Sequence, residues 1–177
     1  MNGVLVLDKP PRMSSAAAVD HVRKRLGVKR AGHGGTLDPI ATGVLPICLG
    51  EATKLAGYLL SDDKAYEAEL VLGVEMDTLD RTGQVTRTRD ATAITREQVE
   101  QALSARKGEH DQMPPMYSAI KIGGTRLYQR ARNGEEVERT PRRVRIDQLD
   151  LLEFSPGVIR IAIACSKGTA LARLARG

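Results

Sequence analysis

The sequence has few cysteines and no long apolar run. Cys48 and Cys165 are its two cysteines, and neither belongs to a CxxC pair or to a cluster of metal-ligand residues, so neither a disulfide framework nor a zinc site is supported. No apolar stretch approaches the roughly 20 residues of a membrane helix, and the N-terminal MNGVLVLDKPP lacks a basic leader before an apolar run. These absences predict a soluble cytoplasmic protein with two buried thiols, no metal and no membrane attachment.

The charge of the chain is unevenly distributed. With 41% apolar and 28% charged residues over 177 positions, the composition predicts one principal folded domain. Residues 1–54 carry 8 basic and 4 acidic side chains, residues 121–145 carry 8 and 3, and residues 55–120 carry 7 and 12. Two basic blocks around an acidic one suggest a surface for a polyanion. Many basic proteins bind no nucleic acid, so charge alone leaves both interpretations open.

The hydrophobic pattern predicts several strands with interspersed helices and no regular strand-helix-strand repeat, which favours an α+β fold around a mixed or antiparallel sheet. Strands are predicted at 3–7, 44–49, 65–72, 117–122, 144–152 and 158–165, and helices at 14–26, 51–60, 95–108 and 127–132. The first helix can be capped by Ser14 or Ser15, and Thr95 begins a capping-box pattern with Gln98.

Residues 31–44, AGHGGTLDPIATGV, contain four glycines and a proline, and they predict a loop. Pro39 biases Asp38 away from the helical region, while the glycines permit close approach of the backbone to a ligand. The pattern fits a carboxylate displayed at the floor of a site. It equally fits a turn in which Asp38 accepts hydrogen bonds from backbone N–H groups.

Several segments in order along the chain resemble the TruB family of tRNA pseudouridine synthases. The resemblance is carried by LDKPPRMSS at 7–15, GHGGTLDPIATGVLPICLGEATKL at 32–55, SDDKAYEAEL at 61–70, PPMYSAIKIGGTRLYQRARNG at 114–134 and CSKGT at 165–169. It implies a pseudouridine synthase-like fold with flanking helices, and conversion of a uridine in the TΨC loop of tRNA to pseudouridine. No cofactor and no protein partner is implied.

The resemblance also implies roles for single residues. Asp38 falls on the catalytic aspartate, Tyr66 on the aromatic that packs against the target uracil, and His33 on the histidine that fills the RNA loop once the base has left. Tyr66 would otherwise be interpreted as a core residue of an alternating strand. Lys9 and Lys64 match basic positions that could neutralise phosphates, or they are ordinary solvated lysines.

The resemblance places an RNA-gripping thumb at about 114–143. Its basic residues include Arg126, Arg130 and Arg132, which are therefore candidate RNA contacts. The resemblance also leads us to expect a catalytic domain that is incomplete at its C-terminus and lacks the family's PUA domain.

Two departures from the family pattern affect the expected activity. Arg12 replaces a motif glycine, and Lys167-Gly168-Thr169 is followed by Ala170, Leu171 and Ala172 where the family has Tyr-Ile-Arg. Either Ala170 and Ala172 replace the tyrosine and the arginine, or the three residues are deleted. The family's arginine pairs with the catalytic aspartate, so its loss predicts a poor catalyst or none.

Three hypotheses follow. The first is a uridine isomerase acting on tRNA, and the second is a non-catalytic tRNA-binding or tRNA-folding module. The third, a phosphate-binding metabolic enzyme, is weakened because the sequence has neither a GxxxxGK[ST] nor a GxGxxG pattern.

Overall fold

The computed structural model describes residues 1–114, 121–122, 125–126 and 139–171, with the backbone alone for 121–122 and 125–126. The chain forms two compact units, Met1–Asp62 and Asp63–Gly177. All strand pairs in the described residues are antiparallel, which confirms the predicted α+β class with antiparallel sheets.

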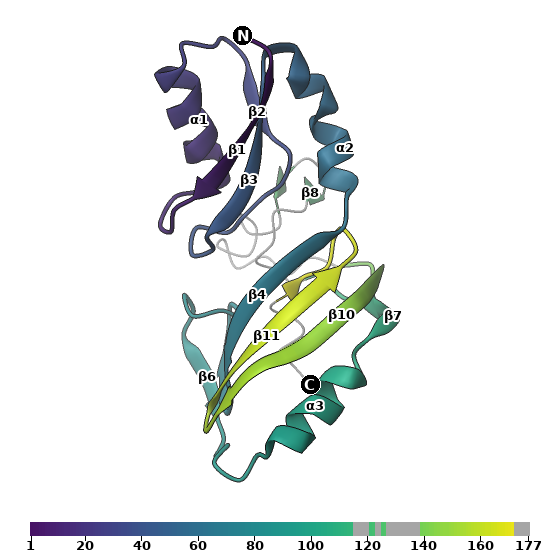
Figure 1. Ribbon diagram of the computed structural model, residues 1–177. Coiled ribbons are helices and arrows are strands. Elements are labelled where there is room, and N and C mark those ends of the chain that lie inside the picture. Colours follow the sequence, from purple (N-terminus) through teal and green to yellow (C-terminus); the bar gives the residue numbers. More distant parts are fainter. Residues whose placement is uncertain (115–120, 123–124, 127–138, 172–177) are drawn as a thin grey trace. The chain divides into compact units, whose positions relative to one another are not determined.

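The first unit is built around a three-stranded sheet of order β1-β3-β2. Its elements are β1 (Gly3–Lys9), α1 (Ser15–Arg25), β2 (Ala31–His33), β3 (Gly43–Leu49), the 3-10 helix η1 (Gly50–Leu55) and α2 (Ala56–Ser61). The ribbons show α1 and α2 on opposite sides of the strands (Figure 1). The core forms between α1 and β3, where Ala18, Val22, Leu45, Ile47 and Leu49 are buried.

Helix α1 begins and ends as its sequence predicts. The Ser14 hydroxyl accepts a hydrogen bond from the Ala17 N–H, so Ser14 is the N-cap. At the other end Gly27 adopts φ 63°, a left-handed conformation that suits glycine after a helix. Ala18 and Val22 lie on the face that packs against the sheet, which fixes α1 as a rigid element beside the strands.

The second unit contains a four-stranded sheet of order β4-β11-β10-β7 and helix α3. Its elements are β4 (Lys64–Val71), β5 (Val74–Met76), β6 (Val85–Thr88), α3 (Arg96–Ser104), β7 (Gly108–Gln112), β8 (Lys121–Ile122), β9 (Thr125–Arg126), β10 (Arg142–Ser155) and β11 (Val158–Cys165). Alternating residues of β11 enter the core, where Ile159, Ile161 and Ile163 are buried.

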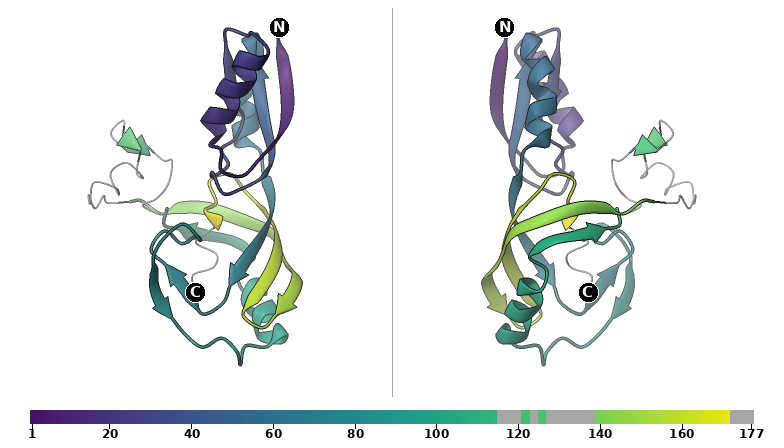
Figure 2. Two further views of the ribbon diagram at one scale, coloured as in Figure 1. Left: turned by 90° about the vertical axis from the view of Figure 1, so that its left-hand side faces the viewer. Right: turned by 90° about the vertical axis from the view of Figure 1, so that its right-hand side faces the viewer.

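Strand β10 bends along its length (Figure 2). Its pairing with β11 shifts register between Ile146 and Gln148 and again between Leu151 and Glu153, and such irregularities bend a strand and increase its twist. Helix α3 begins with the predicted capping box, because the Thr95 and Gln98 side chains each bond the other residue's backbone N–H.

Some predictions of secondary structure were wrong. Ala31–His33, predicted as loop, is strand β2, because its backbone pairs with β3. The helix predicted at 51–60 starts as a 3-10 helix. Strands β5, β6 and β7 were not predicted. Most of the strand predicted at 117–122, and the whole helix predicted at 127–132, lie outside the described residues.

Candidate active site

Asp38 lies in the connection between β2 and β3, at one end of the first unit's sheet. The end of β1 is at the same place, because Lys9 pairs with Gly43, the first residue of β3 (Figure 1). The Asp38 side chain is exposed. Its backbone carbonyl accepts a hydrogen bond from the Ala41 N–H at 3.0 Å, which closes a turn around Pro39. The sequence therefore folds here into a compact turn that presents a carboxylate.

Hydrogen bonds hold the backbone on both sides of Asp38. The Ser15 Oγ accepts from the Leu37 N–H at 2.9 Å and donates to the Leu37 carbonyl at 3.0 Å. On the other side, the Arg12 N–H donates to the Pro39 carbonyl at 2.7 Å. Segment 12–15 is thus bonded to the residue before Asp38 and to the residue after it.

Lys9 is fully buried, which sequence reasoning did not predict. Its Nζ donates to the Pro10 carbonyl at 2.9 Å and to the Met13 carbonyl at 2.8 Å. A buried ammonium group needs such hydrogen bonds, because burying a charge without them costs on the order of several kcal/mol. Lys9 therefore bonds both ends of the loop segment 10–13, which carries Arg12.

His33 is the last residue of β2, opposite Ile47 in the register. Its buried Nδ1 has no hydrogen-bond partner among the residues that the structure describes, so this ring nitrogen keeps unused hydrogen-bonding capacity. The next residue, Gly34, donates its N–H to the Pro46 carbonyl at 2.8 Å and lies against Leu59 of α2. A Cβ at Gly34 would come within 2.7 Å of the Leu59 Cβ, so only glycine fits.

Tyr66 and Lys64 lie on β4 in the second unit, where they pair with Ile163 and Cys165 of β11. The half-buried Tyr66 packs against the core of that unit. Because Asp38 belongs to the other unit, the convergence of Asp38, His33 and Tyr66 on one cleft stays a prediction. The thumb arginines cannot be placed with them either, since Arg130, Arg132 and the Arg126 side chain lie outside the described residues.

A side chain also holds the backbone at Ala170, in the segment that departs from the family pattern. The Gln112 side chain, 8% exposed, accepts from the Ala170 N–H at 2.7 Å and donates to the Ala170 carbonyl at 3.2 Å. Nearby, the Thr169 hydroxyl donates to the Ser166 carbonyl at 2.8 Å. Sequence reasoning missed Gln112, because a polar residue in the segment GEHDQ carries no signal of a partner 58 residues away.

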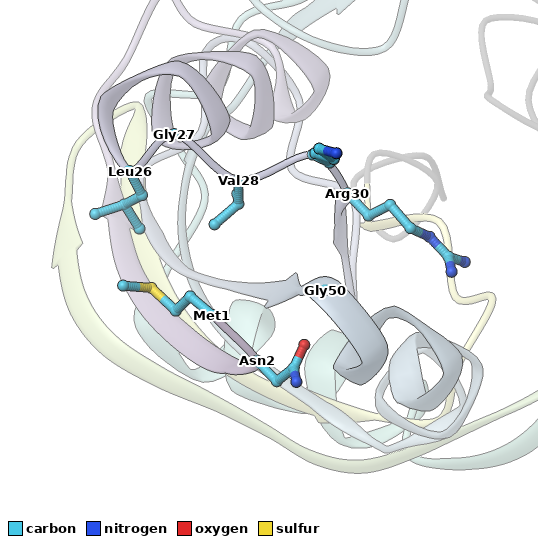
Figure 3. Close-up of a pocket in the computed structure, with 8 residues that line it drawn as sticks. Met1, Asn2, Leu26, Gly27, Val28, Arg30 and Gly50 are labelled. Carbon is cyan, nitrogen blue, oxygen red and sulfur yellow. The ribbon is translucent and has the colours of Figure 1, made fainter.

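The described surface also has a hollow of about 320 Å³ at the other end of the first sheet. Its lining includes Met1, Leu26, Val28 and Arg30 (Figure 3). Asn2 and Gly50, which also line it, directly flank the paired residues Gly3 and Leu49 in the sequence, whereas the candidate site lies at the opposite end of the same strands. The hollow therefore belongs to a different place from Asp38.

Two further findings concern the part of the chain that the structure describes. It holds no group of three or more His, Cys, Asp or Glu side chains arranged to bind a metal ion. None of its helices is long and apolar enough to cross a membrane. The two cysteines are buried and unbonded to each other, as predicted, and burial raises the pKa of the Cys165 thiol.

The chain has many relatives among known proteins. It is 53% identical to the tRNA pseudouridine synthase B of Symbiobacterium thermophilum, over 99% of this chain and 60% of the relative. It is 51% identical to the enzyme of that name from Pseudomonas aeruginosa, over 96% of this chain and 55% of the relative. The chain thus spans a little over half the length of these relatives.

Solved structures show the same fold. A Cbf5-Nop10-Gar1 complex matches with a TM-score of 0.72 and 27% identity, over 97% of this chain and 42% of that one. A structure of an H/ACA RNP bound to a substrate RNA containing 2′-deoxyuridine matches with a TM-score of 0.69 and 25% identity, over 97% and 40%. Residues 23–171 match the N-terminal domain of the TruB family pseudouridylate synthases. This chain therefore belongs to the TruB family.

Proposed function

We propose that this protein converts a uridine in the TΨC loop of tRNA to pseudouridine, with Asp38 as the reacting carboxylate. In this isomerisation the N1–C1′ bond breaks and a C5–C1′ bond forms. The C5 hydrogen leaves as a proton and N1 takes up a proton, so the product has the same atoms as the substrate. No electron acceptor and no second substrate is required, and the protein has to supply a carboxylate, a base-binding surface and RNA contacts.

The observation that carries this proposal is the exposed Asp38 carboxylate on a backbone held on both sides. A reacting carboxylate must be accessible to its substrate and fixed in position, since a displacement of about 1 Å can lower a rate on the order of a hundredfold. The bonds from Ser15 to Leu37 and from Arg12 to Pro39 support that fixed position.

The target base has to leave the RNA stack to reach a side chain on the protein surface. We assign Tyr66 to stacking on the extruded uracil, which is worth roughly 1–3 kcal/mol per base. His33, which is half-buried, would fill the space in the RNA loop that the base has left. Lys64 would neutralise a nearby phosphate, and Lys9 would hold the loop beneath the site.

We further propose that the long connection between β7 and β10 is an RNA-gripping thumb. Gln112 and Arg142 pair directly across these antiparallel strands, so the chain leaves the sheet and returns to it at neighbouring positions. The intervening sequence contains Arg126, Arg130 and Arg132.

The unpaired cysteines and the tRNA-modifying relatives favour the cytoplasm as the place of action.

Salt dependence tests the thumb. Residues 121–145 carry eight basic and three acidic side chains, so binding of a TΨC stem-loop should release counterions and weaken steeply as salt rises. Neutralising Arg126, Arg130 and Arg132 together should weaken binding and flatten the salt slope. An affinity that does not change between low and moderate salt would refute this part of the proposal.

One observation favours a second candidate, a module that binds tRNA without modifying it. Ala170 stands where an ungapped alignment puts the family's tyrosine, and Gln112 holds its backbone in place. Incubating the chain with a TΨC stem-loop, then measuring both bound RNA and pseudouridine in the digested RNA, separates the two functions. Binding with pseudouridine supports the enzyme, while binding without pseudouridine at enzyme excess supports the binding module.

A further inference from the structure

We propose that the Ser15 hydroxyl is the positioning group for Asp38, a role distinct from helix capping. This inference deepens the proposed function and rests on it, because a carboxylate needs positioning only where it acts. Two adjacent serines begin α1, and the sequence alone does not distinguish them. The structure gives them different partners, since Ser14 caps the helix and Ser15 bonds the residue next to Asp38.

The contact between Ser15 and Leu37 has the form of a backbone pair. One hydroxyl both accepts from the Leu37 N–H and donates to the Leu37 carbonyl, as the neighbouring strand of a sheet would. Ser15 is 3% exposed, so water does not replace these bonds when they are lost. The peptide groups on both sides of the Leu37 Cα are thereby fixed, and the second of them leads directly into Asp38.

The hydrogen bonds between Ser15 and Leu37 connect Asp38 to a packed part of the first unit. Ser15 is the first residue of α1, and Ala18, on the next turn, is buried in the core. Leu37 itself packs against that core. The packed helix α1 is therefore connected through the Ser15 hydroxyl to Leu37, the residue before Asp38. On the other side of Asp38, the Arg12 N–H bonds the Pro39 carbonyl.

Three variants separate positioning from folding. Ser15→Ala removes both bonds to Leu37, Ser15→Cys keeps a weaker hydrogen-bonding group of similar size, and Ser14→Ala removes only the helix cap. Ser14→Ala is the matched control, because a lost cap costs about 1 kcal/mol without touching the turn. Should Ser15→Ala fail to fold, Ser15→Cys still tests whether weaker bonds to Leu37 loosen the turn at Asp38.

Amide hydrogen exchange is the readout that does not require activity. The Ala41 N–H bonds the Asp38 carbonyl and the Arg12 N–H bonds the Pro39 carbonyl, whereas the Ser15 hydroxyl bonds the backbone of Leu37. We expect both amides to exchange at least about tenfold faster in Ser15→Ala, with Ser15→Cys between it and the parent. In Ser14→Ala they should exchange as in the parent. Unchanged exchange in Ser15→Ala, or an equal increase in Ser14→Ala, overturns the proposal.

Turnover of a TΨC stem-loop then tests the link to catalysis. Ser15→Ala should lower kcat by about 10- to 100-fold and leave KM within about twofold, because the displaced group acts in the reaction rather than in RNA binding. A normal kcat combined with a loosened turn overturns the positioning role. If the parent chain makes no pseudouridine although it binds RNA, the proposed function fails, and the exchange data still decide whether Ser15 orders the turn.

Discussion

Arg12 offers a sharp test of how the loop beside Asp38 is built. It adopts φ 65°, in the left-handed region that favours glycine, at the position where the family motif has glycine. Arg12 therefore keeps the left-handed backbone conformation that the family's glycine would adopt easily. In this conformation a Cβ lies close to the carbonyl oxygen, which costs about 1–2 kcal/mol.

Substitution to glycine removes that strain but adds freedom to the unfolded chain, which offsets about 0.4–1 kcal/mol. Because the Arg12 side chain is exposed, its loss should change stability little. We therefore expect Arg12→Gly to raise the free energy of unfolding by about 0.5–1 kcal/mol. The Arg12 N–H bond to the Pro39 carbonyl is retained in the variant.

Arg12→Ala is the matched comparison, since it removes the same charge and length but keeps the Cβ. Urea unfolding followed by far-UV circular dichroism should find Arg12→Gly more stable than Arg12→Ala by about 0.5–1 kcal/mol. Ala17→Gly, at an exposed position within α1, should instead lose about 1 kcal/mol, the ordinary cost of a helical glycine. An Arg12→Gly variant no more stable than Arg12→Ala would refute the reasoning.

Three other predictions concern stability and pH. Gly34→Ala should lower the free energy of unfolding by about 1–3 kcal/mol, because its Cβ would meet the Leu59 side chain; the urea midpoint measures this. Gln112→Leu should leave the Ala170 backbone without its partners, which costs about 1–3 kcal/mol and should be seen as faster Ala170 amide exchange. Burial opposes ionisation of Asp80, but hydrogen bonds from two threonines outweigh it and lower the pKa overall. The ionised Asp80 therefore stabilises the fold above its unfolded pKa of about 3.9, and this contribution is lost as the pH falls through the lower folded pKa. Asp80→Asn should lack this pH dependence, which unfolding measured across acidic pH should show.

The fold could be predicted where the hydrophobic pattern is strong. Residues 158–165 alternate Ile159, Ile161 and Ile163 with smaller or polar residues, and they form β11 as expected. Strand β7 was missed because GEHDQ has almost no apolar residues, and it forms by pairing with β10 at the edge of the sheet. Strand β2 was missed for a similar reason, since three residues beside glycines show no period and only their hydrogen bonds to β3 define them.

The candidate site divides in the same way. The exposed turn at Asp38 follows from local residues, because a glycine-rich segment with a proline cannot continue a regular element. The contacts that hold it do not follow, since the Ser15 bond to Leu37 spans 22 residues and a sequence pattern carries no record of its partner. Lysines are almost never fully buried, so the burial of Lys9 was equally beyond prediction.

The most direct test of the Asp38 assignment is release of the uracil C5 hydrogen from RNA labelled at that position. It should be measured with enzyme in excess over a TΨC stem-loop, for the chain as it stands and for a variant with Ala170→Tyr, Leu171→Ile and Ala172→Arg. We expect slow release from the first, faster release from the second, and none from either when it also carries Asp38→Asn. Release that survives Asp38→Asn would contradict the assignment of Asp38 as the reacting carboxylate.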